Sequence, residues 1–211
     1  MTSGVTAALD YLTAATKAAL GGGESECSAR GRHVVIVGNG DTATDCVATA
    51  LRQGAAGVVQ LVRKPKPPAA ERLWPYPAAG EKTDYGQEEA ASVFGADPRL
   101  YGATVKTLLA DENGALRAVL AVTPQGEKEL PAELLLTATG FSGAEPESAA
   151  AFGLVLDGRG RLGDGDFRTD DPKVFACGDM RRGASLVVWA IAEGRECARA
   201  VDQALEGYTN L

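Results

Sequence analysis

Hydrophobic and polar positions divide the chain into segments with two different periods. The run from His33 to Val37 is almost continuously apolar and predicts a strand that is buried on both faces. The segment from Asp41 to Gly54 has a helix-forming composition, and Gly57 to Val62 is a second β-branched run. A strand, a helix and a strand in this order predict a β-α-β unit with parallel strands.

Helical periodicity marks both ends of the chain. From Val5 to Leu20, residues Val5, Leu9, Leu12 and Leu20 fall on one predicted helical stripe, and three glycines at 21–23 end the segment. A longer helix is predicted to begin near Ser185. Its apolar stripe repeats at four-and-three spacing and consists of Val187, Ile191, Gly194, Ala198, Val201 and Leu205.

The middle of the chain is predicted to contain a long irregular connection and several strands. The stretch from Arg63 to Arg99 is rich in proline, glycine and charge, and it contains one short predicted helix near Glu88 to Phe94. An Asn113-Gly114 pair suits the positive backbone angles of a tight hairpin. Strands are predicted on both sides of this pair and beyond it, at 104–110, 116–122, 134–137 and 174–177.

Composition and charge exclude several classes of function. The 28 acidic and 21 basic residues give a formal net charge of −7, which disfavours binding to nucleic acid or to an anionic membrane. No segment reads as a signal peptide or a membrane span. The four cysteines form no CxxC pair, so we expect no redox dithiol and no metal site, but reduced thiols of a cytoplasmic protein. Cys46 and the single histidine, His33, are interpreted as a core thiol and a strand-edge residue.

The first chemical motif follows the strand that ends at Val37. It reads Gly38-Asn39-Gly40-Asp41-Thr42-Ala43 and opens a predicted helix, which is the context of a dinucleotide-binding turn. The first glycine permits a sharp turn, the second admits a pyrophosphate against bare backbone, and the small Ala43 lets helix and strand approach. The free N–H groups of the helix start favour the anion.

The end of the second strand indicates which dinucleotide is bound. An NAD-selective unit usually has Asp or Glu there to bind the ribose 2′-hydroxyl. This chain instead has Arg63, Lys64 and Lys66, which suit a 2′-phosphate through charge-assisted hydrogen bonds. The prediction is therefore NADPH. The alternative is that these are solvated loop cations.

A second group of candidate site residues lies near the carboxyl end. There Gly178 and Asp179 follow the predicted strand and precede the long helix, and Ala138-Thr139-Gly140 lies upstream. From Val5 to Leu205 the chain resembles the carboxyl part of the small subunit of NADPH-dependent glutamate synthase, within the pyridine nucleotide-disulphide oxidoreductase-like flavoproteins. The stretches that carry this resemblance are residues 38–46, 84–90, 97–101 and 178–191.

The resemblance implies an electron-input flavoprotein. In that family, hydride passes from NADPH to FAD, and electrons continue through iron-sulfur clusters to a large subunit that forms glutamate from glutamine and 2-oxoglutarate. By resemblance, Gly140, Gly178 and Asp179 belong to the flavin site, with Asp179 on the ribityl chain. Ser185, Leu186 and Val187 would face the pyrimidine edge of the flavin, where the helix dipole would stabilise the reduced ring.

The resemblance also predicts the organisation of the chain. We expect an α/β fold with a helix and linker at 1–30 on the side of the FAD domain. A Rossmann-like NADPH-binding domain with a parallel sheet follows at 31–140, and the carboxyl-terminal part of an FAD-binding domain at 141–211. The family's cluster-binding cysteines and first flavin fingerprint do not precede Val5. We therefore expect only part of the flavin site here, uncovered apolar stripes on the first and last helices, and no activity from the chain alone.

Two other interpretations stay open. The chain could be a truncated, non-catalytic dinucleotide-binding or docking module, or a related FAD-dependent NAD(P)H oxidoreductase outside glutamate synthesis. Its partner would be the large subunit or the upstream part of the same subunit.

Overall fold

The computed structural model describes residues 3–25, 27–68, 83–162 and 165–211. The chain forms two compact units, Met1–Gly140 and Phe141–Leu211. Residues 69–82 of the predicted irregular connection lie outside the described residues.

A parallel five-stranded sheet forms the centre of the first unit. Its strand order is β1-β8-β2-β3-β4, and every neighbouring pair is parallel. The strands are β1 (Val5–Ala7), β2 (His33–Val37), β3 (Gly57–Val62), β4 (Arg99–Tyr101) and β8 (Leu134–Thr137). The predicted α/β fold and the parallel β-α-β unit are thereby confirmed.

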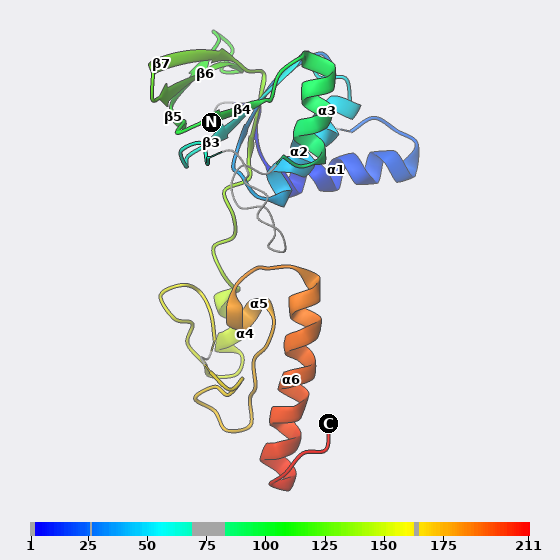
Figure 1. Cartoon of the computed structure of the whole chain (residues 1–211), viewed down its shortest axis with the longest axis vertical. Coiled ribbons are helices and arrows are strands. Elements are labelled where there is room, and N and C mark those ends of the chain that lie inside the picture. The colour runs from blue at the N-terminus through cyan, green and yellow to red at the C-terminus, as the bar shows by residue number, and fades with distance from the viewer. Residues whose placement is uncertain (1–2, 26, 69–82, 163–164) are drawn as a thin grey trace. The chain divides into compact units, whose positions relative to one another are not determined.

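Three helices cover one face of this sheet (Figure 1). They are α1 (Ala8–Gly21), α2 (Asp41–Arg52) and α3 (Tyr85–Phe94). The alternation of side chains along β2 points Val34 and Ile36 toward them, into a core that contains the fully buried Ala43 and Cys46 of α2. Burial raises the pKa of the Cys46 thiol to about 12, with a smaller contribution from Asp45. Cys46 is thus a neutral core residue, as predicted.

An antiparallel three-stranded sheet packs on the opposite face. It consists of β5 (Thr104–Ala110), β6 (Leu116–Thr123) and β7 (Gly126–Pro131) in the order β5-β6-β7. Val35 and Leu61 of the parallel sheet meet Val119 and Leu130 in this second core. The predicted hairpin joins β5 to β6, and Gly114 has a φ of +79°, as an Asn-Gly turn requires. The first unit therefore has three layers.

The amino-terminal segment differs from its prediction. Val5–Ala7 is a strand that pairs with β8, so the helix begins only at Ala8. The buried face of α1 is formed by Ala8 and Tyr11, whereas Leu9 and Leu20 of the predicted stripe are exposed. β1 and α1 form part of the sheet and of the core of the first unit. A strand of three residues is too short to show a two-residue period. The sequence pattern therefore does not distinguish it from the helix that follows directly.

The second unit is small and mostly irregular. It contains α4 (Pro146–Ala150), α5 (Asp179–Arg182) and α6 (Val187–Glu206). Its core cluster consists of Ala149, Leu154, Leu162 and Ala176. The predicted strand at 174–177 is wrong: within the described residues, this segment forms a single bridge, between Arg168 and Phe175. None of the helices in the described ranges combines the length and apolar character that crossing a bilayer requires.

Candidate dinucleotide and flavin sites

The glycine turn between β2 and α2 has a backbone that only glycine can adopt at its first position. Gly38 has a φ of +147°, and a Cβ placed there would lie 2.1 Å from the carbonyl oxygen of Ala138. Its N–H donates to the carbonyl of Leu61 at 3.1 Å, which ties the turn to β3. The first glycine of the motif therefore allows the turn to pass close to the residue that follows β8.

The second glycine of the motif leaves an open surface. Gly40 is the N-cap of α2, with φ −94° and ψ 179°, and its carbonyl accepts from the N–H groups of Ala43 and Thr44. No heavy atom lies within 4 Å of the position that a Cβ on Gly40 would occupy. Asn39, Gly40 and Asp41 are exposed, and no side chain caps the helix. The start of α2, which continues through Thr42, thus presents backbone N–H donors beside a bare backbone, as an anion site requires.

The three predicted cations follow β3 directly. Arg63, Lys64 and Lys66 are all exposed. The carbonyl of Lys64 accepts from Gly102 N at 2.9 Å, which ties this segment to the end of β4. The ammonium of Lys66 lies 6.0 Å from the centroid of the Tyr101 ring. The carboxyl ends of β3 and β4 thus bring a cationic segment next to an aromatic ring.

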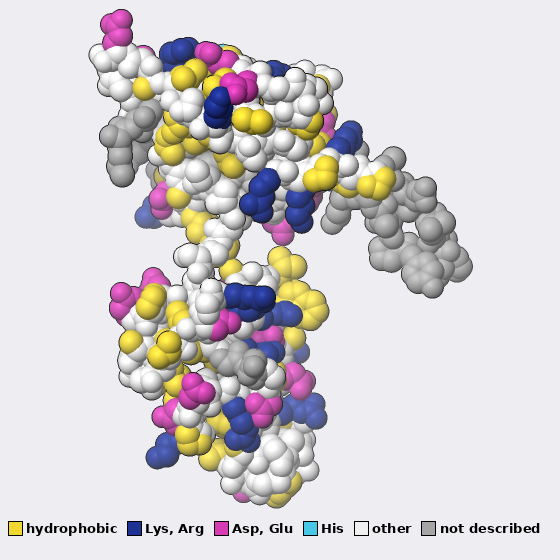
Figure 2. All heavy atoms as spheres, turned by 90° about the vertical axis from the view of Figure 1, so that its left-hand side faces the viewer, with side chains coloured by type: hydrophobic (Ala, Val, Ile, Leu, Met, Phe, Trp, Pro, Cys, Tyr) yellow, Lys and Arg dark blue, Asp and Glu magenta, His cyan; other side chains and the backbone are white. Residues whose placement is uncertain are grey.

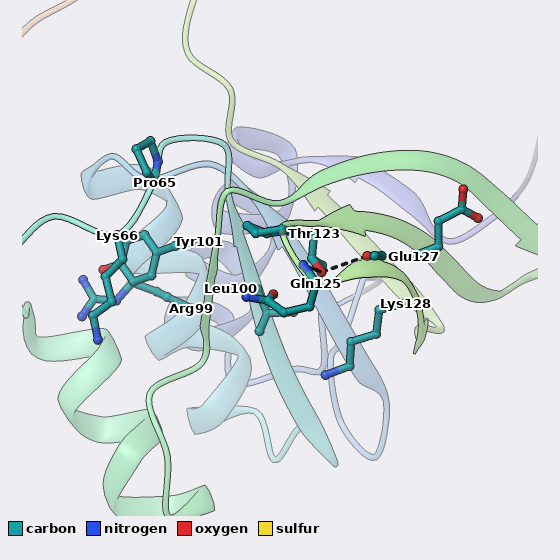
Figure 3. Close-up of a pocket in the computed structure, with 11 residues that line it drawn as sticks. Pro65, Lys66, Arg99, Leu100, Tyr101, Thr123, Gln125, Glu127 and Lys128 are labelled. Carbon is teal, nitrogen blue, oxygen red and sulfur yellow. Dashed lines mark hydrogen bonds between the residues drawn. The ribbon is translucent and has the colours of Figure 1, made fainter.

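A pocket of about 600 Å³ opens at the same place (Figure 3). Its lining comes from the loop after β3, from β4 and from the β6–β7 hairpin: Pro65, Lys66, Arg99, Leu100, Tyr101, Thr123, Pro124, Gln125, Gly126, Glu127 and Lys128. In Figure 3, Lys66, Tyr101 and Arg99 cluster on one side, and Gln125 and Lys128 lie on the other. In open α/β sheets, ligands bind outside the carboxyl ends of the strands.

Arg99 is a pocket residue that the sequence analysis did not single out. Its guanidinium lies 5.3 Å from the Tyr101 ring centroid and pairs with Asp97, with Nη2 2.6 Å from Oδ2. Burial alone would raise the pKa of Asp97, but the hydrogen bonds and charge of Arg99 hold that pKa below its ordinary value. The Asp97–Arg99 pair therefore stays ionised and fixes the wall of the pocket. The sequence points to residues 97–101 only through the family resemblance.

The predicted flavin-site residues lie in the second unit, except Gly140, which ends the first. Gly178 has a φ of +62° and precedes Asp179, whose Oδ1 accepts from the N–H of Ser185 at 3.1 Å. This bond joins the Gly-Asp turn to the start of α6, where Leu186 is an N-cap without a side-chain hydrogen bond. Ser185, Leu186 and Val187 are exposed. The structure thus brings together the second group of predicted residues within one unit.

The start of α6 forms an exposed apolar surface. Its large hydrophobic residues with more than half of their surface exposed are Leu186, Val187, Val188, Trp189 and Ile191. Figure 2 shows hydrophobic and basic side chains gathered at one end of this unit. Of the predicted stripe of the last helix, Val187, Ile191 and Leu205 are exposed, and Gly194 and Val201 are half-buried.

Glu193 holds the Gly-Asp turn, and the sequence analysis did not single it out. Its buried carboxylate accepts from Gly178 N at 2.9 Å and pairs with Arg181 at 3.1 Å and Arg182 at 3.2 Å. The two guanidiniums also lie over the rings of Phe167 and Trp189, respectively. A glutamate on a helix suggests a solvated residue, and the sequence holds no local signal for this role, because tertiary contacts define it.

Replacing Glu193 with Ala is expected to destabilise the second unit by about 3 kcal/mol, because two partly buried guanidiniums and a backbone N–H lose their acceptor. Hydrogen exchange of the α6 backbone amides measures this local loss. The matched control is Glu196→Ala, because Glu196 makes one exposed pair with Arg199 at 3.9 Å. Such pairs contribute at most about 1 kcal/mol. Equal effects of the two substitutions would contradict the prediction.

Comparison with known proteins places the chain in a family. Residues 2–194 match the family model described as "Pyridine nucleotide-disulphide oxidoreductase". The chain is 40% identical to the glutamate synthase [NADPH] small chain of Bacillus subtilis, over 99% of this chain and 47% of that protein. It is 33% identical to the Escherichia coli small chain, over 96% of this chain and 46% of that protein. The chain thus spans about half the length of these relatives.

Solved structures give the same fold. The thioredoxin reductase of T. acidophilum matches with a TM-score of 0.62 at 19% identity, over 97% of this chain and 61% of that chain. The thioredoxin reductase of Lactococcus lactis matches with a TM-score of 0.59 at 18% identity, over 84% of this chain and 54% of that chain. The predicted resemblance to the glutamate synthase small subunit is confirmed by the sequence identities. The chain therefore belongs to the pyridine nucleotide-disulphide oxidoreductase family.

Proposed function

We propose that this chain is the NADPH-binding portion of a glutamate synthase small subunit. The observation that carries the proposal is the uncapped start of α2 beside Gly40. The next strand along the chain, β3, leads at its carboxyl end into Arg63, Lys64 and Lys66. The relatives at 33–40% identity support the choice of this enzyme within the family.

The residues of the first unit fit NADPH along its length. The backbone donors at Gly40 and Asp41 would hold the pyrophosphate, and the missing Cβ of Gly40 leaves the space that it needs. The cations after β3 would hold the 2′-phosphate, and Tyr101 offers a ring beside the adenosine end. This fit supports NADPH over NADH.

The second unit fits one edge of a flavin. Asp179 is exposed beside the start of α6, and the uncapped N–H groups there offer donors to an electron-rich ring edge. FAD, when bound, would supply the ring that accepts hydride from NADPH. In this proposal, Asp179 orients the flavin and Glu193 keeps the Gly-Asp turn in place.

The onward route of electrons is also part of the proposal. Electrons would leave through iron-sulfur clusters held outside these 211 residues and reach a large subunit, where glutamine and 2-oxoglutarate yield glutamate. The glutamate synthase small-chain relatives support this partner. Four free cysteines agree with a reducing compartment such as the cytoplasm.

Calorimetric titration of the chain with NADPH and with NADH tests the proposal. We expect saturable binding of NADPH at one site per chain, and weaker binding of NADH. Parallel titrations with 2′,5′-ADP and 5′-ADP locate the preference at the adenosine end. A chain that is folded by circular dichroism but binds none of these ligands would overturn the proposal.

A further inference from the structure

Two fully buried glutamines connect the glycine turn to α3. Gln60 on β3 is 0% exposed and Gln87 on α3 is 3% exposed. Gln60 interrupts an otherwise apolar strand, between the buried Val58 and Val62. A buried amide destabilises the fold unless its polar atoms are hydrogen-bonded, so the partners of these two side chains indicate why they are present.

The two amides form one directed chain of hydrogen bonds. Gln87 Oε1 accepts from Asp84 N at 3.3 Å, and Gln87 Nε2 donates to Gln60 Oε1 at 2.9 Å. Gln60 Nε2 in turn donates to the carbonyl oxygen of Gly38 at 2.9 Å. Gln87 Nε2 also donates to the hydroxyl oxygen of Thr44 at 3.1 Å. One side chain of α3 therefore contacts the start of α2 directly and the glycine turn through Gln60.

The approach of α3 to α2 depends on Gly86. A Cβ on Gly86 would lie 2.5 Å from the carbonyl oxygen of Thr44, so only a glycine lets the two helices come this close. Beside it, the hydroxyl of Tyr85 donates to Asp45 of α2. At the far end, Arg52 of α2 pairs with Glu89 at 2.5 Å. These contacts hold Gln87 within reach of both of its partners.

The geometry of a peptide group transmits this restraint to the ligand side. Because the peptide bond is planar and trans, the Gly38 carbonyl and the N–H of Asn39 point in opposite directions. A carbonyl held by Gln60 therefore fixes the direction of the Asn39 N–H, within the exposed turn that is expected to meet the pyrophosphate. Amides do not ionise, so this restraint is independent of pH.

We propose that Gln87 and Gln60 are positioning residues that set the orientation of the glycine turn for the dinucleotide pyrophosphate. The inference rests on the proposed NADPH binding. It goes beyond the glycine motif because it assigns the geometry of the turn to residues on β3 and α3, 20 and more positions away in sequence.

Methionine variants of nearly equal shape test the inference. Gln60→Met and Gln87→Met each remove the amide and are expected to weaken NADPH binding about tenfold, the factor for one lost hydrogen bond. Each also leaves the other glutamine without its partner and lowers the temperature of unfolding. The double variant removes both members of the Gln87–Gln60 bond, so the part of the thermal stability lost with that bond should return, while the Gly38 carbonyl still lacks its donor. If the amides position the turn, the NADPH affinity of the double variant stays low. An affinity that recovers together with the stability would overturn the inference.

Gln53→Met is the matched control. Gln53 lies at the other end of α2, where its Oε1 accepts from Tyr11 at 2.9 Å and from Ala29 N at 2.7 Å. This variant should lose stability and keep its NADPH affinity. Reduced affinity in Gln53→Met, equal to that of the Gln60 variant, would show that general destabilisation explains the effect.

A measurement without nucleotide separates this inference from the proposed function. Amide NMR spectra of the ligand-free variants should show changed resonances of Asn39 and Gly40 in Gln60→Met and Gln87→Met, and unchanged ones in Gln53→Met. If wild-type protein binds no NADPH but these resonances change, the proposed function is wrong and only the restraint of the turn stands. If NADPH binds the wild-type and methionine variants equally, the positioning role is wrong and the proposed function stands.

Discussion

Replacing Gly40 with Ala is expected to weaken NADPH binding about 100-fold while the chain stays folded. The added methyl group would meet no heavy atom of the protein within 4 Å, and the φ of −94° at this position suits any residue. We therefore expect the free energy of unfolding to change by less than about 0.5 kcal/mol. The same methyl group would occupy the surface against which the pyrophosphate lies, and overpacking of about 1 to 3 kcal/mol accounts for the lost affinity. Calorimetry and urea unfolding give the two quantities.

Gly38→Ala is the contrasting variant. Its Cβ would lie 2.1 Å from the Ala138 carbonyl oxygen, at a φ of +147°. This substitution should lower the free energy of unfolding by more than about 2 kcal/mol and lose NADPH binding as a consequence. A folded Gly40→Ala chain with the NADPH affinity of the wild-type protein would place the pyrophosphate elsewhere.

The sequence alone predicts the centre of the first unit well. β2 and β3 have the predicted bounds because a strand buried on both faces is a mostly apolar, β-branched run, with Gln60 as the polar exception in β3. The start of α2 follows from the glycine motif for a similar reason, since the turn chemistry is local. Local signals of this kind need no knowledge of distant partners.

Other elements depend on partners that are distant in the sequence. In β7 only Leu130 is buried, so the strand carries no apolar alternation and is recognised only by its pairing with β6. Conversely, the apolar segment at 174–177 predicts a strand. Among the described residues of its unit, however, this segment forms only one β-bridge to another segment. A pattern of apolar residues indicates burial, and it does not say which backbone will supply the hydrogen bonds.

The supporting residues of the candidate sites were also beyond sequence reasoning. Gln60 and Glu193 look like an interruption of a strand and a solvated helix residue, respectively. Their roles come from a carbonyl at Gly38 and an N–H at Gly178, which lie 22 and 15 positions away. Motif residues could be found because their chemistry is encoded by spacing, whereas these side chains are defined by tertiary contacts.

The combined variant Arg63→Ala, Lys64→Ala and Lys66→Ala is expected to lose the preference for NADPH over NADH. A charge-assisted hydrogen bond contributes about 1.5 to 3 kcal/mol, so removing the cations should weaken NADPH binding by about 10- to 100-fold. NADH affinity should change little, because a ribose 2′-hydroxyl gains much less from a cation than a phosphate does. Titration with both cofactors, and with 2′,5′-ADP and 5′-ADP, measures the change at the adenosine end.

A second triple variant controls for the change in net charge. Lys17, Arg30 and Arg117 are exposed cations of the same unit, and none of them follows β3 or lines the pocket. Replacing all three with Ala removes an equal number of positive charges and should keep the preference for NADPH. If both triple variants lose affinity equally, the effect belongs to the overall field of the protein. If neither variant changes the preference, the residues after β3 are solvated loop cations and the 2′-phosphate is bound elsewhere.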